Sequence, residues 1–343
     1  MPDHRGPGPA APTPPPATPP AAPATPPSAD SSIPAADSPA AGPGAPTPTP
    51  ADSSIPAAVP PDWATPVSWR AAVREATELL AAAGVPSPEV DARALAEHVL
   101  GGHPALVGPP TAGQLTRFAG LVERRRAREP LQHVTGEMHF RYLRLRAEPG
   151  AFVVRPETEL VAEHAIRAAR EHAAPRVVDL CTGSGAIALA VATEVPGAQV
   201  WAVELSEAAI EVAARNVTEH APHVQLVAGD AADALPELDG TVDVVVANPP
   251  YVPPGAVPRD PEVREHDPDL ALYGGGDDGL DVPRAVIASA ARLLRPGGAF
   301  VMEHADVQGA AVRAACAAAG VFTEIRTERD FTGRDRMVLA TRA

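Results

Sequence analysis

The sequence predicts an α/β protein whose core is a doubly wound, mostly parallel sheet, preceded by a small helical bundle. Three observations support this prediction. Short apolar runs alternate with helical patterns in the second half of the chain, a glycine-bearing turn follows the first run, and polar residues end four runs in succession at Asp179, Glu204, Asp230 and Asn248. Ligands of open α/β sheets bind at the carboxyl ends of the strands, so these four residues are expected in one pocket.

Residues 1–62 are expected to form a disordered Pro/Ala-rich tail. The first 60 residues hold 20 of the 43 prolines, and the octapeptide Ala-Asp-Ser-Ser-Ile-Pro-Ala-Ala occurs at 29–36 and again at 51–58. A segment with so few large apolar side chains cannot offset the entropy lost on ordering. It is either a solvated extension or a docking arm for a proline-recognising domain, and it lacks the apolar core of a secretory signal.

Residues 63–135 are expected to form a small helical bundle. Ser68 precedes apolar residues at helical spacing, Ser87 precedes a second such pattern, and a third begins near Thr111. The run Glu123-Arg124-Arg125-Arg126-Ala127-Arg128 is either a solvated helix face or a docking patch.

Residues 138–154 alternate apolar and polar side chains, which predicts a β-hairpin linker at 136–156, ahead of the core at 157–343. In the core, the strand at 176–180 leads to Gly183 and Gly185, which permit positive φ and close approach of a ligand to the backbone. A helix beginning near Ala186 offers free N–H groups.

The next strand ends at Glu204, about 20 residues after the glycine turn, where an acid can accept ribose hydroxyls. A dinucleotide needs a third glycine, but Ala188 stands at that position, so S-adenosylmethionine fits better than NAD. Asp230 either accepts from the adenine amino group or caps a turn. The expected cofactor-binding residues are Asp179, Cys181, Thr182, Gly183, Ser184, Gly185, Glu204, Asp230, Ala231 and Asn248.

The tetrapeptide Asn248-Pro249-Pro250-Tyr251 follows the apolar strand at 242–247. Asn248 Oδ1 and the Pro249 carbonyl can each accept one N–H of a planar amide or amine, while the Tyr251 ring covers its face. We therefore expect Asn248, Pro249 and Tyr251 to be catalytic, with Pro250 also in the substrate site. The alternative is a rigid turn between strand and loop.

Several further segments accompany this tetrapeptide: Pro130-Leu131-Gln132-His133-Val134-Thr135-Gly136-Glu137, Phe140, Arg155-Pro156-Glu157-Thr158-Glu159, and Glu303-His304. From about Trp69 to Ala340 the chain resembles the HemK/PrmC-type protein-(glutamine-N(5)) methyltransferases. The resemblance implies a Rossmann-like, seven-stranded S-adenosylmethionine-dependent core. It also implies methyl transfer to the glutamine of the Gly-Gly-Gln loop in peptide chain release factors. It further implies that the bundle at 63–135 holds the protein substrate, whereas the alternative is a plain structural cap.

The resemblance has three departures: Cys181 stands where glycine is common, Glu204 where aspartate is common, and Ala231 where the residue is usually bulkier. Helix capping would explain the Arg155 to Glu159 segment, because Pro156 suits a helix start and acids favour the amino end of its dipole. The resemblance adds that the segment borders the active site, with Arg155 as a substrate-binding residue.

Composition narrows the function further. The formal charge is −15 and all 28 basic residues are arginine, so the chain repels nucleic-acid phosphates at long range, and a protein substrate is favoured. Direct nucleic-acid binding and a membrane partner are not expected. The two cysteines, Cys181 and Cys316, suggest a cytoplasmic protein without disulfides, and no acid or histidine cluster has the spacing of a metal site.

Two other functions stay open. An adenine-N(6) methyltransferase acting on RNA or DNA could use the same tetrapeptide to grip a flipped-out amine. The chain could also be a docking protein with a degenerate core.

Overall fold

The computed structural model describes residues 68–343, so the expected tail and the first residues of the expected bundle lie outside the described part. The bundle helices are α1 (Trp69–Ala82), α2 (Pro88–Leu100), α3 (Ala112–Arg126) and α4 (Leu131–Thr135), with the short turn η1 (Pro104–Leu106) between α2 and α3. Their apolar faces enclose one core, in which the Trp69 and Phe118 rings meet edge to face with centroids 5.6 Å apart.

The caps of these helices agree largely with the sequence. The Ser68 hydroxyl accepts the Ala71 N–H, and Thr111 forms a capping box with Gln114. Ser87 is the N-cap residue of α2, but its hydroxyl makes no capping bond.

A seven-stranded sheet forms the second part of the chain, as the resemblance implies. Its strands are β3 (Arg176–Leu180), β4 (Gln199–Glu204), β5 (Gln225–Ala228), β6 (Val242–Ala247), β7 (Leu294–Glu303), β8 (Phe322–Arg329) and β9 (Asp335–Arg342). Their order is β5-β4-β3-β6-β7-β9-β8. The five strands from β5 to β7 in this order are parallel to one another, whereas β9 runs antiparallel to both β7 and β8.

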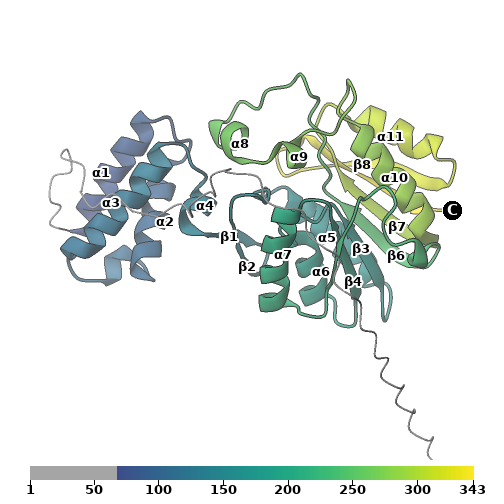
Figure 1. Ribbon diagram of the computed structural model, residues 1–343, viewed down its shortest axis with the longest axis horizontal. Coiled ribbons are helices and arrows are strands. Elements are labelled where there is room, and N and C mark those ends of the chain that lie inside the picture. The colour runs from purple at the N-terminus through teal and green to yellow at the C-terminus, as the bar shows by residue number, and fades with distance from the viewer. Residues whose placement is uncertain (1–67) are drawn as a thin grey trace, which may run out of the picture. The chain divides into compact units, whose positions relative to one another are not determined.

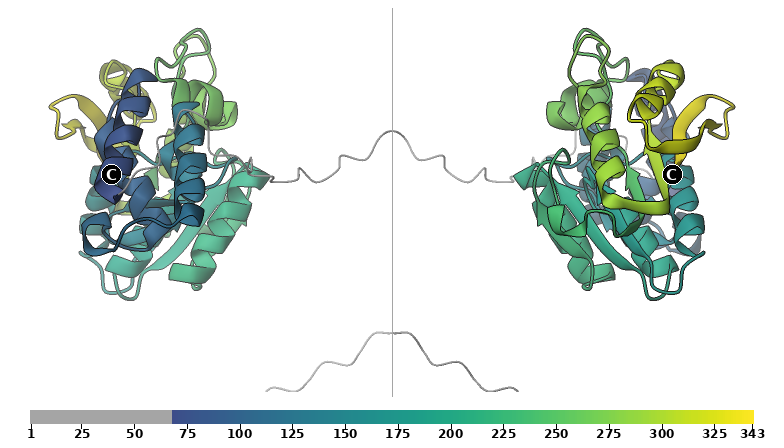
Figure 2. Two further views of the ribbon diagram at one scale, coloured as in Figure 1. Left: turned by 90° about the vertical axis from the view of Figure 1, so that its left-hand side faces the viewer. Right: turned by 90° about the vertical axis from the view of Figure 1, so that its right-hand side faces the viewer.

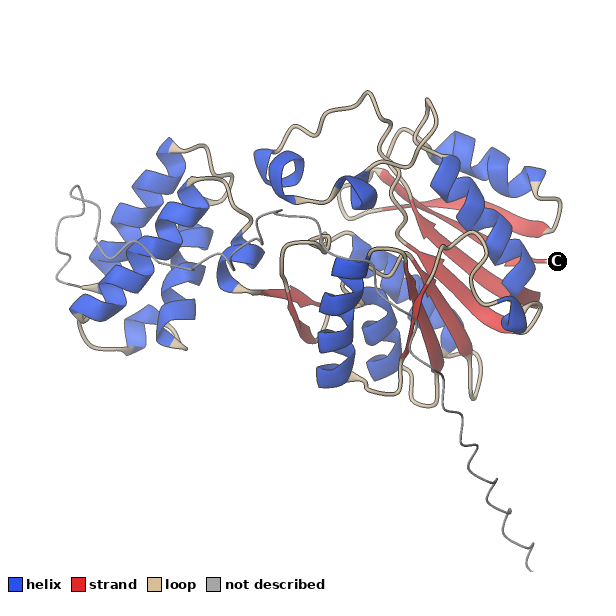
Figure 3. Ribbon diagram, in the orientation of Figure 1, coloured by secondary structure: helices blue, strands red, loops and turns tan. Residues whose placement is uncertain are grey.

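Helices cover both faces of this sheet (Figures 1, 2 and 3). On one face lie α5 (Thr158–Ala169), α6 (Ala186–Glu194) and α7 (Glu207–His220), and on the other α10 (Asp281–Leu293) and α11 (Gly309–Ala318). All six residues of β6 are buried. Val244 and Val246 pack in the apolar core on the side of α5 and α6, and Val245 and Ala247 pack in the core on the side of α10 and α11. A strand covered on both faces has a nearly continuous apolar sequence, and that of β6 is interrupted only by Asp243.

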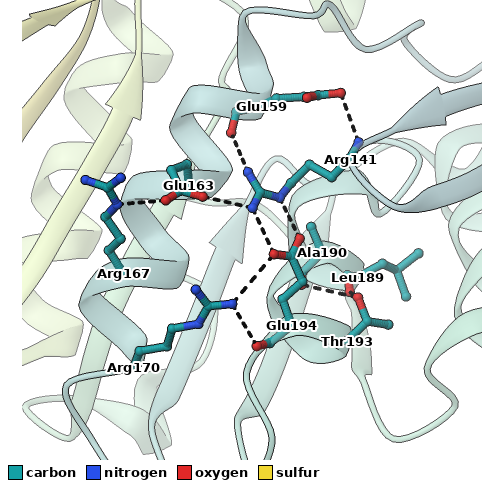
Figure 4. A network of polar contacts seen from close by, with 9 residues as sticks. All are labelled: Arg141, Glu159, Glu163, Arg167, Arg170, Leu189, Ala190, Thr193 and Glu194. Atoms are coloured by element: carbon teal, nitrogen blue, oxygen red, sulfur yellow. Dashed lines mark hydrogen bonds and ion pairs between the residues drawn. The ribbon is translucent and has the colours of Figure 1, made fainter.

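In the hairpin of β1 (Glu137–Phe140) and β2 (Leu143–Arg146), an arginine of the turn binds two helices of the core (Figure 4). The Arg141 backbone N–H donates to Glu159 of α5 at 2.9 Å. Its guanidinium pairs with Glu163 at 2.8 Å and with Glu194 of α6 at 2.5 Å. Hydrogen bonds to these acids raise the pKa of Arg141, so the cation is permanent.

Two short helices, α8 (Pro261–His266) and α9 (Asp269–Leu272), interrupt the long loop after β6. None of the helices described between residues 68 and 343 is long and apolar enough to cross a membrane.

We predict that Arg141→Ala lowers the free energy of unfolding by about 3 kcal/mol, because it removes the largely buried cation that Glu163 and Glu194 share and leaves them only the more exposed Arg167 and Arg170. Arg167→Ala is the matched control, since Arg167 pairs with the same Glu163 but its side chain is 71% exposed, and it should cost less than about 1 kcal/mol. Urea unfolding measures both. Equal losses in the two variants would contradict the anchoring role.

Candidate active site

A cavity opens at the carboxyl edge of the sheet, where β3, β4 and β6 end. The register pairs Leu180 with Ala247, so the loop that begins at Cys181 and the loop that begins at Asn248 start side by side. Of the residues predicted for the site, those that line the cavity are Cys181, Thr182, Gly183, Ser184, Glu204, Asp230, Ala231, Asn248, Pro249, Pro250 and Tyr251. Asp179, Gly185 and Arg155 lie outside its lining.

The loop after β3 is shaped by left-handed backbone positions. Gly183 has φ 58° and Gly185 has φ 87°, and a Cβ at Gly183 would meet no protein atom within 4 Å. Cys181 also has positive φ, at 62°, a conformation that glycine adopts without strain, which fits the glycine that the resemblance implies at this position. Burial, with Glu204 and Asp179 nearby, raises the pKa of Cys181, so its sulfur stays a thiol.

Asp179 acts on this loop from inside the protein. It is fully buried, and its Oδ2 accepts the Thr182 hydroxyl at 2.6 Å and the Ala188 N–H at 3.1 Å. Burial raises the pKa of Asp179 to about 7. The carboxyl group thus joins the loop to the first turn of α6 and does not face the cavity.

Glu204, at the end of β4, binds the same loop. Its Oε2 accepts the Gly183 N–H at 2.8 Å, and its Oε1 accepts the N–H groups of Leu205 and Ser206 at 2.9 Å. A carboxylate has about four acceptor positions, so Glu204 keeps room for a ribose hydroxyl. Asp230 lines the cavity and also caps a turn, because its Oδ1 accepts the Ala232 N–H.

The lining fits an adenosine that carries a cationic group better than a pyrophosphate. It contains two carboxylates, Glu204 and Asp230, and no arginine or histidine among the described residues. The open space at Gly183 lets a ligand approach the backbone closely. The residues present therefore fit S-adenosylmethionine.

The side chains of the Asn-Pro-Pro-Tyr corner are held from two other elements. Asn248 Nδ2 donates to the hydroxyl of Thr158 at 3.4 Å, and that hydroxyl donates to Glu303 Oε2 at 2.8 Å. The Tyr251 hydroxyl donates to Glu303 Oε1 at 3.2 Å. Burial and the Glu303 carboxylate raise the pKa of Tyr251, which stays a phenol.

The backbone of the corner is held from the opposite side. Gln308, which is buried, donates from Nε2 to the carbonyls of Tyr251 at 2.8 Å and Asp278 at 3.0 Å. A Cβ on Gly274 would lie 2.6 Å from the Pro250 carbonyl oxygen, and one on Gly279 would lie 2.4 Å from that of Tyr251. The glycine-rich loop therefore packs directly on the corner.

Sequence reasoning gave no role to Thr158 or Gln308. Thr158 lies within the segment Arg155 to Glu159, which the resemblance already placed at the border of the active site. Gln308 carries no local pattern, because its partners lie 57 and 30 residues away in the chain.

Capping alone does not explain the segment Arg155 to Glu159. The N-cap residue of α5 is Glu157, and it makes no side-chain capping bond. Instead, Arg155 pairs with Asp267 at 2.6 Å and stacks on Phe152, Glu157 pairs with Arg336 at 3.7 Å, and Glu159 binds the Arg141 N–H. Each charged side chain of the segment binds a different part of the chain.

The expectation of a solvated helix face or a docking patch at 123–128 is wrong for two of its arginines. Arg125 is buried and pairs with Asp91 at 2.8 Å and with Glu262 of α8 at 2.8 Å. Arg128 pairs with the same Glu262 at 2.6 Å. These charges are neutralised within the chain, so they are not available to a phosphate backbone.

Acidic and histidine side chains do not gather into a metal site in the described part of the chain, where no group of three or more His, Cys, Asp or Glu is placed to hold an ion. Glu303 and His304 are both buried and bonded within the protein.

Comparison with known proteins agrees with this geometry. Residues 71–136 match the model of the PrmC N-terminal domain, and residues 143–260 match that of the methyltransferase small domain. The chain is 49% identical over 283 residues to the release factor glutamine methyltransferase of Streptomyces coelicolor, covering 80% of this chain and 98% of that one. It is 44% identical over 287 residues to that of Bifidobacterium longum, covering 78% and 97%.

The fold and site define an S-adenosylmethionine-dependent methyltransferase. The chain belongs to the release factor glutamine methyltransferase family. A further relative, the 4-amino-L-phenylalanine/4-methylamino-L-phenylalanine methyltransferase of Streptomyces pristinaespiralis, is 44% identical over 257 residues, covering 73% of this chain and 87% of that one. An identity of this size therefore accompanies more than one kind of acceptor.

We predict that Gly279→Ala lowers kcat roughly 10²-fold, because the added Cβ must displace the Tyr251 carbonyl and misplace the corner. Gly240→Ala is the matched control, since Gly240 also has positive φ, 65°, but a Cβ there meets nothing within 4 Å. Steady-state kinetics and thermal unfolding should show strain in both variants but a large kcat loss only in the first. Similar kcat values would contradict the packing argument.

Proposed function

We propose that this protein transfers a methyl group from S-adenosylmethionine to the side-chain amide nitrogen, N5, of a glutamine in the Gly-Gly-Gln loop of peptide chain release factors. The observation that supports this most is the Asn248 amide at the cavity edge. Its Nδ2 is engaged by Thr158, while its Oδ1 has no partner among the described residues and is free to accept an N–H. Family membership supports the release factor as partner, and a release factor would place the reaction in the cytoplasm.

An amide nitrogen is a poor nucleophile because its lone pair is delocalised into the carbonyl. When bound, S-adenosylmethionine supplies an electrophilic methyl group on a sulfonium. Asn248 Oδ1 and the Pro249 carbonyl accept the two hydrogens of the substrate amide and fix the direction of its nitrogen, while the Tyr251 ring covers the amide plane. A new C–N bond forms as the C–S bond breaks, and one proton leaves the nitrogen afterwards.

Placement should contribute more than any single hydrogen bond in this site. Correct orientation of two reactants is worth roughly 7–11 kcal/mol of the barrier, against about 1 kcal/mol for one hydrogen bond. The corner meets this need, since its side chains and its backbone are each held by groups outside the tetrapeptide. We propose that Glu204, Asp230 and the loop from Cys181 to Gly185 hold the cofactor, with Asp179 behind the loop.

Arg155 is proposed to border the protein substrate. Its side chain is 31% exposed beside the cavity residue Phe152, and its pairing with buried Asp267 fixes where the guanidinium lies.

We predict that Asn248→Ala lowers turnover by roughly 10²-fold or more, since the substrate amide loses an aligned acceptor, while S-adenosylmethionine affinity changes only a few-fold. The assay follows label from methyl-labelled cofactor into a release factor, and calorimetry measures cofactor binding. Near-normal turnover in the variant would remove Asn248 from the mechanism.

The acceptor is tested with the wild-type protein and four substrates: a release factor, its loop Gln→Asn variant, 4-amino-L-phenylalanine and bulk nucleic acid. We expect label on the loop glutamine alone, located by mass spectrometry. Label on the free amino acid or on adenine would replace the proposed substrate, and cofactor binding without any label would reject it.

A further inference from the structure

Glu303 is a buried carboxylate that has no role in the proposed methyl transfer. It ends β7, its exposure is 1%, and it does not line the cavity. It has no cation at ion-pair distance among the described residues: Arg336 of β9 acts on it electrostatically, but pairs with Asp330 and Glu157. A buried charge without such a partner costs stability, so packing alone does not account for it.

The two hydrogen bonds of Glu303 have a directional consequence. A carboxylate only accepts, so the single proton of the Thr158 hydroxyl must point at Glu303 Oε2. The hydroxyl then has only lone pairs to offer Asn248, and the Asn248 amide must turn its NH2 toward it. The carbonyl Oδ1 is left facing away from Thr158.

Without the Glu303 carboxylate, nothing fixes the direction of the hydrogen bond between Thr158 and Asn248. A Thr158 hydroxyl free to rotate could donate to Oδ1 of a flipped Asn248, and the corner would then present N–H groups to the N–H groups of the substrate. Donor against donor makes no hydrogen bond, so the flipped corner cannot grip an amide or amine nitrogen. The same carboxylate accepts the Tyr251 hydroxyl and so fixes the ring that covers the substrate.

We propose that Glu303 is a positioning residue that sets the donor–acceptor direction of the corner: through Thr158 it turns Asn248 Oδ1 toward the substrate nitrogen, and directly it holds Tyr251. This inference rests on the proposed function in one respect, that the acceptor nitrogen presents N–H groups to Asn248.

Because Glu303 can be protonated, the direction of the hydrogen bonds in the corner should depend on pH. Burial raises the pKa of Glu303 to about 7, against the hydrogen bonds from Thr158 and Tyr251 and the charge of Arg336, while Glu157 raises it further. The protonated acid carries a proton of its own, so one hydroxyl must accept it and the enforced direction is lost. Turnover should fall as the pH drops through about 7.

Stability should change in the opposite sense. The folded pKa lies above the ordinary value of 4.5, so this group's contribution to stability is full below pH 4.5 and is lost as the pH rises through about 7. Glu303→Gln removes that buried charge at pH 8, and the variant should therefore unfold no earlier than the wild type.

The test compares Glu303→Gln, Thr158→Val and Thr158→Ser with the wild type and with the control Glu219→Gln, an exposed acid of α7. Measurements are kcat and KM from pH 6 to 8.5, S-adenosylmethionine affinity by calorimetry, and the unfolding temperature. We expect Glu303→Gln and Thr158→Val to lose roughly 10²-fold in kcat at pH 8, with cofactor affinity unchanged. Thr158→Ser keeps the hydroxyl and should keep most activity.

Two readouts separate positioning from a structural role. The acid limb of the kcat profile should disappear in Glu303→Gln, and the double variant with Thr158→Val should be no slower than Glu303→Gln alone, because both act on one path. Wild-type kcat in Glu303→Gln at pH 8, or a kcat loss matched by losses of unfolding temperature and cofactor affinity, would overturn the proposal. The product made by the wild type judges the proposed substrate separately, and the variants are compared on whichever acceptor it methylates.

Discussion

The pairing of β3 with β6 is the constraint on which the rest of the site depends. Consecutive strands β3, β4 and β5 build the sheet in one direction, and β6 returns to the other side of β3, so the loops after β3 and β6 part to opposite faces. A crevice between such loops follows from the topology. The cofactor loop and the Asn-Pro-Pro-Tyr corner meet there because Leu180 and Ala247 are register partners, and this pairing is supported by apolar burial on both faces.

Rigidity is the property that the surrounding residues supply. The two prolines of the corner fix φ and remove donors, but they do not fix side chains or the position of the whole turn. Buried polar groups do so: Gln308 holds the backbone, and Glu303 with Thr158 holds the side chains. A protein interior makes such bonds costly to leave unmade, so a fully bonded network also resists rearrangement.

The sequence predicted what local chemistry determines. The strand β6, the start of α6, the Ser68 cap and the positive φ of Gly183 and Gly185 each follow from a pattern a few residues long. Partners distant in the chain have no such pattern. Thr158 meets a residue 145 positions away and Arg155 one 112 positions away, and only the fold brings them together.

The exposure of the arginines at 123–128 was also predicted wrongly, because their partners are distant in the chain. A run of arginines on one helix resembles a solvated face when its partners are unknown, yet Glu262 receives both Arg125 and Arg128. Burial alone would raise the pKa of Glu262, but hydrogen bonds from these two arginines hold it at about 2. Arginine suits such a site, because its planar fork serves a carboxylate with several donors and stays charged.

The pairing of Glu262 with Arg125 and Arg128 connects the helical bundle to the long loop that follows the Asn-Pro-Pro-Tyr corner. The loop carries Glu262 in α8 and, five residues later, Asp267, which Arg155 binds. One end of the segment is therefore attached to α3 and the other to the turn ahead of α5, beside Thr158. The loop that follows the corner is thus fixed at Glu262 to the bundle and at Asp267 to the segment that carries Thr158, so one set of ion pairs joins the bundle to the residues that hold the corner.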